Sequence, residues 1–287
     1  MNILICGASG FVGRHIRGAL QKAGHLVIGA VRQPRHVHDI SVDFCKDSSK
    51  DVWLPRLENI DVVINAVGVL RDSQDNSMQR LHQDTPLALF DACNEVGIKR
   101  IVHISALGVD SGIDVPYFTS RLAAEQGLQE MSTSMRWLCL RPSVIYGEDG
   151  ASARMFRWLS RLPVHLLPMG GNQALQPVHI DDICTAIVCW IENDSAENLM
   201  VAAVGSEPTT MRGMLDSYRI QSGRSAPWHV AIPKSLIRLT ARIGDLIPTS
   251  PLCRDTLAMM AVGNTADPTA FSKLLKYTPM SYREFIQ

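Results

Sequence analysis

Residues 1–13 read Met1-Asn-Ile-Leu-Ile-Cys-Gly-Ala-Ser-Gly-Phe-Val-Gly13, an apolar run that ends in three glycines spaced three apart. The run predicts a buried parallel strand over 3–6. The next segment predicts a helix over 11–23, because apolar residues recur at every fourth position and a glycine follows: Val12, Ile16, Leu20 and Gly24. With a second strand expected over 25–31, the glycines occupy the turn of a βαβ unit.

Each glycine of this turn has a distinct expected role. Gly7 permits a backbone bend that is closed to residues with a Cβ, Gly10 lets a pyrophosphate approach, and Gly13 lets the helix pack tightly on the strand. The N-terminus of the helix then presents unpaired N–H groups to the phosphates. A tight corner without a ligand is the alternative interpretation, but the βαβ context favours a dinucleotide. The residues expected to contact it here are Gly7, Ser9, Gly10, Phe11, Val12 and Gly13.

Composition bounds the class of protein and of ligand. The 28 basic and 28 acidic residues among 287 give a net charge of zero, which argues against nucleic acid as a partner and favours a small molecule. The seven cysteines lack the spacing of a zinc or redox motif and are expected to be reduced thiols. Because no basic leader and no stretch of eighteen apolar residues is visible, we expect a cytoplasmic protein without a transmembrane segment.

Strands and helices are expected to alternate through the first half of the chain. The predicted strands are 61–65, 100–105 and 137–141, and the predicted helices are 85–96 and 117–131. Thr85 is expected as an N-cap, with Pro86 at the first helical position and Gly97 as the stop. This alternation predicts an α/β fold with a doubly wound parallel sheet covered by helices on both faces.

Frequent prolines and glycines mark a change of organisation from Pro142 onward. Further helices are predicted over 178–191, 210–222 and 233–247. We therefore expect a Rossmann NAD(P)-binding domain, made of 1–143 plus 178–204. A small, mostly helical substrate lobe is expected from 144–177 plus 205–287.

The second strand ends Ala30-Val31-Arg32, where an acidic residue would bind the ribose 2′-hydroxyl of NAD. An arginine there, with Arg35 nearby, favours the 2′-phosphate of NADP(H) over NAD(H). A solvated loop arginine is the alternative. From fold position alone, Asp43 is expected at the adenine edge, and Asn65-Ala66-Val67-Gly68 beneath the ribose and nicotinamide.

Several motifs occur in the order and spacing of one known group of enzymes. They are Gly7-Ala-Ser-Gly-Phe-Val-Gly13, Asn65-Ala-Val-Gly68, Lys99-Arg-Ile-Val-His-Ile-Ser105, Tyr117 followed by Ala123-Ala-Glu125, Leu140-Arg-Pro-Ser-Val-Ile-Tyr-Gly147 and Gln176-Pro-Val-His-Ile-Asp-Asp182. In these motifs the chain resembles the extended and atypical short-chain dehydrogenase/reductases, which include nucleotide-sugar epimerases. It is most similar to the branch of the NADPH-binding accessory subunit of respiratory complex I, through Ile104-Ser-Ala-Leu-Gly108 and Pro233…Ile243-Gly-Asp-Leu-Ile-Pro248.

The resemblance implies a catalytic Ser or Thr, a Tyr, and a Lys four residues after the Tyr. Tyr117 matches the tyrosine and Ser105 is the candidate hydroxyl, but Arg121 stands where the lysine is expected. Leu107 stands where the epimerases carry their catalytic hydroxyl. The resemblance also implies that Tyr117, Arg121 and Pro142 contact the cofactor. Arginine keeps the positive charge that favours a phenolate, but its larger planar group cannot repeat the lysine's ribose contacts.

Two other polar clusters are considered as metal-binding sites. His179, Asp181 and Asp182 precede a predicted helix, and we expect Asp181 or Asp182 to be its N-cap. The loop pair His36 and His38 lacks a third ligand. No metal site is therefore predicted.

The sequence leads to a reductase-like protein that binds NADP(H) and acts on a small carbonyl, hydroxyl or nucleotide-linked substrate, with Tyr117 as the acid/base. The alternative is a catalytically reduced relative that uses NADP(H) as a structural or sensing ligand and works through a protein partner. Epimerase chemistry on UDP-sugars is a third interpretation, which Leu107 and Arg121 disfavour.

Overall fold

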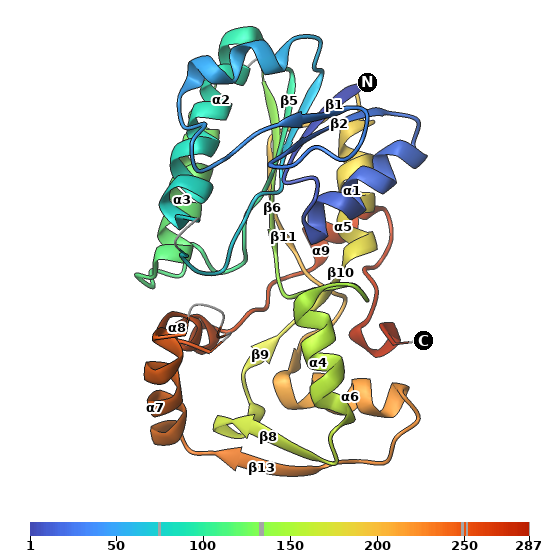
Figure 1. Cartoon of the computed structure of the whole chain (residues 1–287). Coiled ribbons are helices and arrows are strands. Elements are labelled where there is room, and N and C mark those ends of the chain that lie inside the picture. Colours follow the sequence, from blue (N-terminus) through green and yellow to red (C-terminus); the bar gives the residue numbers. More distant parts are fainter. Residues whose placement is uncertain (74–75, 132–134, 248–249, 251, 287) are drawn as a thin grey trace. The chain divides into compact units, whose positions relative to one another are not determined.

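A computed structural model describes residues 1–73, 76–131, 135–247, 250 and 252–286. The chain divides into two compact units, each taken by itself below (Figure 1). Unit 1 comprises Met1–Arg141 and Cys184–Val201, and unit 2 comprises Pro142–Ile183 and Ala202–Gln287. The assignment of cofactor binding to 1–143 plus 178–204, and of substrate selection to the rest of the chain, remains a prediction. Pro248, from the sequence motif of the tail, lies outside the described residues.

A seven-stranded sheet in the order β11-β6-β5-β4-β1-β2-β3 forms the centre of unit 1. Its strands are β1 (Asn2–Cys6), β2 (Leu26–Val31), β3 (Asp39–Ser41), β4 (Val62–Asn65), β5 (Arg100–Ile104), β6 (Arg136–Pro142) and β11 (Leu199–Ala203). Neighbouring strands from β3 to β6 all pair in parallel. The predicted doubly wound parallel sheet is therefore confirmed.

Helices cover both faces of this sheet, as expected. Figure 1 shows α2 (Thr85–Val96) and α3 (Pro116–Gln129) on one face, and α1 (Phe11–Lys22) and α5 (Ile180–Ile191) on the other. The central strands β1 and β4 are apolar except for Asn2 and Asn65, and all of their residues but Asn2 are buried. Helix α1 turns its buried Ile16 and Leu20 toward the core. Burial on both faces explains why these strands read as continuous apolar runs in the sequence.

The start of α2 differs from the prediction. A π-helical turn, Arg80–Asp84, runs directly into this helix, so Asp84 takes the N-cap position and Thr85 does not. The hydroxyl of Thr85 donates instead to the carbonyl oxygen of Phe44 at 2.6 Å. At the other end Gly97 has a φ of 76°, which confirms it as the left-handed C-cap. Short 3₁₀ turns occur at Lys50–Val52, Leu54–Leu57, Met169–Gly171 and Tyr282–Glu284.

Unit 2 combines helices with paired short strands. Its helices are α4 (Ala151–Arg161), α6 (Met211–Gln221), α7 (Lys234–Asp245), α8 (Arg254–Val262) and α9 (Thr269–Leu275). Its strand pairs are β7 (Ile145–Tyr146) with β10 (Val178–His179), β9 (Ala174–Leu175) with β12 (Thr209–Thr210), and β8 (Val164–Pro168) with β13 (Trp228–Ile232). The sequence predicted α6 and α7 but not α4, α8 and α9. It predicted none of these strands, which are too short for a period of two to show.

The predicted N-cap of α5 is wrong. This helix starts at Ile180, so Asp181 and Asp182 lie in its first turn, and His179 caps it by accepting the backbone N–H of Asp181 at Nδ1 over 3.2 Å. Asp182 is buried and accepts two hydrogen bonds of 2.8 Å, from the Tyr277 hydroxyl and the Met280 N–H. Among the described residues, no helix has both the length and the apolar character to cross a membrane.

Candidate functional site

The glycine turn between β1 and α1 has the backbone geometry that the sequence predicted. Gly7 has a φ of +78°, and a Cβ there would lie 2.9 Å from the carbonyl oxygen of Ala66. A Cβ at Gly13 would overlap the carbonyl oxygen of Gly7, which confirms the need for close packing of helix on strand. Gly10 forms the N-cap of α1 in an extended conformation and is exposed. The turn therefore leaves the N-terminus of α1 open to an anionic ligand.

A cleft in unit 1 starts at this turn. Arg32 and Asp43 line it, and so does the segment that follows β4. Its lining residues are Gly7, Ser9, Gly10, Ala30, Val31, Arg32, Val42, Asp43, Phe44, Cys45, Ala66, Val67, Gly68, Val69, Asn76 and Leu81. The side chain of Arg32 is exposed and donates to Asn76 Oδ1 at 3.3 Å. The structure thus brings the predicted turn, Arg32, Asp43 and 66–68 to one cleft.

A buried ion pair fixes the β2–β3 edge close to Arg32. The Arg17 guanidinium of α1 binds the carboxylate of Asp39, and their side chains are 9% and 2% exposed. Gly29 makes room for the pair, since a Cβ there would overlap the guanidinium. Burial opposes ionisation of Asp39, but the backbone N–H groups of Arg35 and His36 together with Arg17 outweigh it and hold the pKa of this carboxyl below its ordinary value.

His82 links the cleft wall to helix α3, and sequence reasoning missed it. Its Nε2 accepts the backbone N–H of Val69 at 3.1 Å, so the proton of the neutral ring resides on Nδ1. Nδ1 lies 3.3 Å from the hydroxyl oxygen of Ser120, which donates in turn to the carbonyl of Pro116 at 2.6 Å. His82 belongs to the π-helical turn, a feature that occurs frequently at functional sites.

Tyr117 and Arg121 lie together one turn apart on α3, as their spacing predicted. The guanidinium carbon of Arg121 is 4.8 Å from the centre of the Tyr117 ring, and His82 meets that ring edge-on at 5.6 Å. Arg121 is buried and donates from Nη1 to the carbonyl of Ile104 at 2.9 Å, while its other amino group lies against Gly68. Burial, and then the charge of Arg121, lower the pKa of His82 to about 2, so this imidazole is neutral.

Ser105 follows the carbonyl that Arg121 binds. It is buried, and its hydroxyl has no hydrogen-bond partner among the described residues. Two residues earlier, on β5, His103 shares a 3.2 Å hydrogen bond with Asn65. Burial, followed by the charge of Arg121, lowers the pKa of His103 to about 3. Asn65 also accepts the N–H of Val67 at 3.1 Å. Buried, neutral polar groups therefore fix the backbone at the ends of β4 and β5.

The remaining predicted residues are not among those that line the cleft. Phe11 and Val12 are in the first turn of α1, where the Phe11 ring packs edge-on against His15 at 5.2 Å. Pro142 ends β6 and belongs to unit 2. The catalytic and cofactor-binding roles assigned to these positions and to the cleft residues remain predictions.

Comparison with known proteins decides the family. The model of the NAD dependent epimerase/dehydratase family matches residues 3–203. The chain belongs to this family. Family membership confirms the resemblance seen in the sequence motifs.

Curated relatives are similar over part of their length. NADH dehydrogenase (ubiquinone) 1 alpha subcomplex subunit 9 from Mus musculus mitochondria is 25% identical over 216 residues, which are 70% of this chain and 56% of the mouse protein. Ceramide reductase from Caulobacter vibrioides is 26% identical over 197 residues, 66% of this chain and 60% of the reductase. The chain thus spans 56–60% of these relatives, and the first of them confirms the predicted likeness to the complex I branch.

Solved structures share the fold over the whole chain. Human epimerase family protein SDR39U1 with NADPH has a TM-score of 0.75 at 17% identity, covering 100% of this chain and 99% of the human one. UDP-glucuronic acid 4-epimerase from Bacillus cereus, in complex with UDP-glucuronic acid and NAD, has a TM-score of 0.70 at 19% identity, with 100% and 96% covered. At these identities the likeness shows the fold alone.

Proposed function

We propose that the chain binds NADP(H) in the cleft of unit 1 and uses it to reduce, or oxidise, a small carbonyl or hydroxyl compound. The observation that carries this proposal is that the glycine turn, Arg32 and residues 66–69 line the same cleft. His82 hydrogen-bonds to Val69 in this lining and packs against the ring of Tyr117. The glycines support a dinucleotide, because side chains at Gly7 and Gly13 would collide with backbone. Unit 2 is proposed to select the substrate.

Tyr117 is the proposed acid/base. A bound nicotinamide supplies a hydride in reduction and accepts one in oxidation. The Tyr117 hydroxyl donates its proton to the substrate carbonyl oxygen in reduction and takes it back in oxidation. Arg121, 4.8 Å from the ring, supplies the positive charge that favours the phenolate, while the carbonyl of Ile104 and the ring itself hold its guanidinium in place.

NADPH should bind about tenfold more tightly than NADH, a difference of about 1.4 kcal/mol, because Arg32 offers a charge-assisted contact to the 2′-phosphate. Asn76 supports this role by holding the guanidinium at the rim of the cleft. Fluorescence titration of both nucleotides tests it. Arg32→Ala should weaken NADPH to the affinity of NADH and leave NADH unchanged, whereas Lys22→Ala, which removes an equal charge at the far end of α1, should change neither. Equal affinities in the wild type would remove the role of Arg32.

A second function, binding without turnover, is favoured by Arg121 itself. Its Nη1 donates to the Ile104 carbonyl and its other amino group lies against Gly68. These contacts differ from the ribose contacts that the resemblance implies for the family's lysine. NADP(H) would then be a structural or sensing ligand for a protein that acts through a partner, as the name of the mouse relative suggests for that protein. Tight NADPH binding together with background oxidation across aldehydes, quinones and nucleotide sugars would favour this second function.

A further inference from the structure

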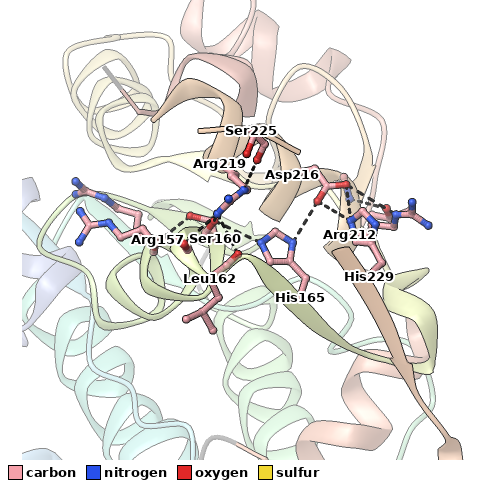
Figure 2. Close-up of polar contacts among 12 residues, drawn as sticks. Arg157, Ser160, Leu162, His165, Arg212, Asp216, Arg219, Ser225 and His229 are labelled. Carbon is pink, nitrogen blue, oxygen red and sulfur yellow. Dashed lines mark hydrogen bonds and ion pairs between the residues drawn. The ribbon is translucent and has the colours of Figure 1, made fainter. Parts of the chain in front are cut away.

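Three potential metal ligands converge in unit 2. His165 lies on β8 and His229 lies directly opposite it on the paired strand β13, while Asp216 projects from α6 (Figure 2). The Asp216 carboxylate lies 3.2 Å from Nδ1 of His165 and 2.9 Å from Nε2 of His229. All three ligand atoms lie within 4.8 Å of one another.

The buried histidine is oriented for a cation. His165 has a side chain only 1% exposed, and its Nε2 lies 3.4 Å from the carbonyl oxygen of Ser160. A carbonyl oxygen only accepts, so in the neutral ring Nε2 carries the proton and Nδ1 keeps its lone pair. That lone pair faces the carboxylate of Asp216, and Nδ1 has no hydrogen bond of acceptable geometry among the described residues. The same carboxylate also lies at hydrogen-bond distance from His229 Nε2, 2.9 and 3.0 Å from its two oxygens. A positive charge between His165 Nδ1 and Asp216 would satisfy both groups, and either a second proton on the imidazole or a metal ion supplies it.

We propose that His165 Nδ1, His229 Nε2 and the Asp216 carboxylate bind a divalent transition-metal ion of the Zn²⁺ type. Two imidazoles and one carboxylate suit zinc and its neighbours, whose bonds to N and O of about 2.0–2.2 Å separate tetrahedral ligand atoms by about 3.3 Å. The two carboxylate–imidazole separations of 2.9 and 3.2 Å are close to this value. The two imidazole nitrogens lie within 4.8 Å of each other, and an ion would hold them at about 3.3 Å.

The surroundings of the three ligands match those of a metal site. A metal-bound histidine commonly donates its second ring N–H to a backbone carbonyl, the position that Ser160 occupies for His165. Arg219 donates to the same carbonyl at 3.3 Å and to that of Leu162 at 3.0 Å, which fixes this loop (Figure 2). The side chains of Asp216 and His229 are 26% and 22% exposed, so water can complete the coordination.

Arg212 is the competing cation. Its Nε lies 3.8 Å from Asp216 Oδ2, one helical turn along α6, and its side chain is 51% exposed. Because this contact is long and solvent-exposed, it is weak, and the arginine can turn away when an ion binds. Removal of Arg212 should therefore strengthen metal binding, whereas loss of a ligand should weaken it.

Co²⁺ binding to the full chain tests the proposal. After treatment with a chelator, the wild type should bind one Co²⁺ with visible d–d absorption, and Zn²⁺ should displace it. His229→Gln and Asp216→Asn, both at partly exposed positions, should each weaken Co²⁺ binding at least tenfold, and Arg212→Gln should strengthen it about threefold or more. A His36→Gln/His38→Gln double variant removes the exposed histidine pair and is the matched control.

Folding is checked separately by circular dichroism and thermal melting. Zn²⁺ should raise the melting temperature of the wild type and not that of His229→Gln, a difference that a purely structural histidine would not produce. Absence of saturable Co²⁺ binding by the wild type would overturn the proposal. So would binding that survives both His229→Gln and Asp216→Asn, or that disappears only in the His36/His38 control.

Discussion

Replacing Tyr117 by Phe removes a single hydroxyl and keeps the ring. The ring contacts the Arg121 guanidinium at 4.8 Å and His82 edge-on at 5.6 Å, and a phenylalanine ring preserves both contacts. Stability should therefore change by no more than about 0.5 kcal/mol. NADPH affinity should also stay within a few-fold of the wild-type value, because the turn and Arg32 are untouched.

Catalysis should respond very differently. Loss of a group that transfers a proton in the transition state typically costs a factor of about 10²–10⁴, equivalent to about 2.7–5.4 kcal/mol of transition-state stabilisation. The assay is NADPH oxidation at 340 nm with aldehydes, quinones and nucleotide sugars. The fall should be in kcat, since the hydroxyl acts on the reacting oxygen, with little change in the KM for NADPH.

Arg121→Lys is the companion variant, because it keeps the charge and restores the residue type of the family pattern. It should preserve or raise turnover, while the loss of the bond to the Ile104 carbonyl lowers stability by about 1.5–3 kcal/mol. Robust wild-type turnover that persists in Tyr117→Phe would refute the assignment of Tyr117. A wild type that binds NADPH and never oxidises it would instead favour the binding function.

Two further predictions concern the nucleotide turn and the β2–β3 edge. Gly10→Val should abolish NADPH binding without unfolding the protein, because the side chain fills the space expected for the pyrophosphate. Gly18→Ala is the control, since a Cβ there meets nothing within 4 Å, and this variant should bind NADPH normally in the same titration. Asp39→Asn should destabilise the protein by about 3–5 kcal/mol at neutral pH, because it leaves the buried Arg17 unpaired. Since the folded pKa of Asp39 is depressed, its contribution is complete above the ordinary carboxyl pKa and is lost as pH falls through the folded pKa. Urea unfolding should therefore show the gap between wild type and variant closing in acid, and a constant gap would contradict the shift.

Local signals explain which parts of the fold were predictable. The predicted boundaries of α1 and α2 agree with the structure within one residue, because an apolar period of 3.6 and a terminal glycine each act within a few residues. The N-cap assignment of Thr85 failed for a non-local reason: its hydroxyl reaches the carbonyl of Phe44, 41 positions earlier. No sequence window contains that contact.

The same distinction applies to the candidate site. Arg32, Asp43 and 66–68 could be placed because the ends of successive parallel strands meet at one edge of a sheet. Asn76 and His82 could not be placed, because Asn76 lies outside the regular elements and His82 lies in a π-helical turn, whose period differs from the 3.6 residues that the sequence pattern tests. Likewise, the proposed metal ligands lie far apart in the sequence: Asp216 follows His165 by 51 positions, and His229 follows Asp216 by 13. These spacings match no short metal-binding motif.

Arg121 also explains why two functions remain in competition after the structure is known. A buried cation disfavours nearby protonated imidazoles, and it helps to keep His82 and His103 neutral with pKa values of about 2 and 3. Neutral imidazoles at these positions can accept and donate the hydrogen bonds that hold the cleft wall and the ends of β4 and β5. This positioning role needs only the charge and would be required for nucleotide binding alone. Turnover makes a stricter demand, a mobile proton on Tyr117, and for that reason the comparison of Tyr117→Phe with Arg121→Lys separates an enzyme from a binding protein.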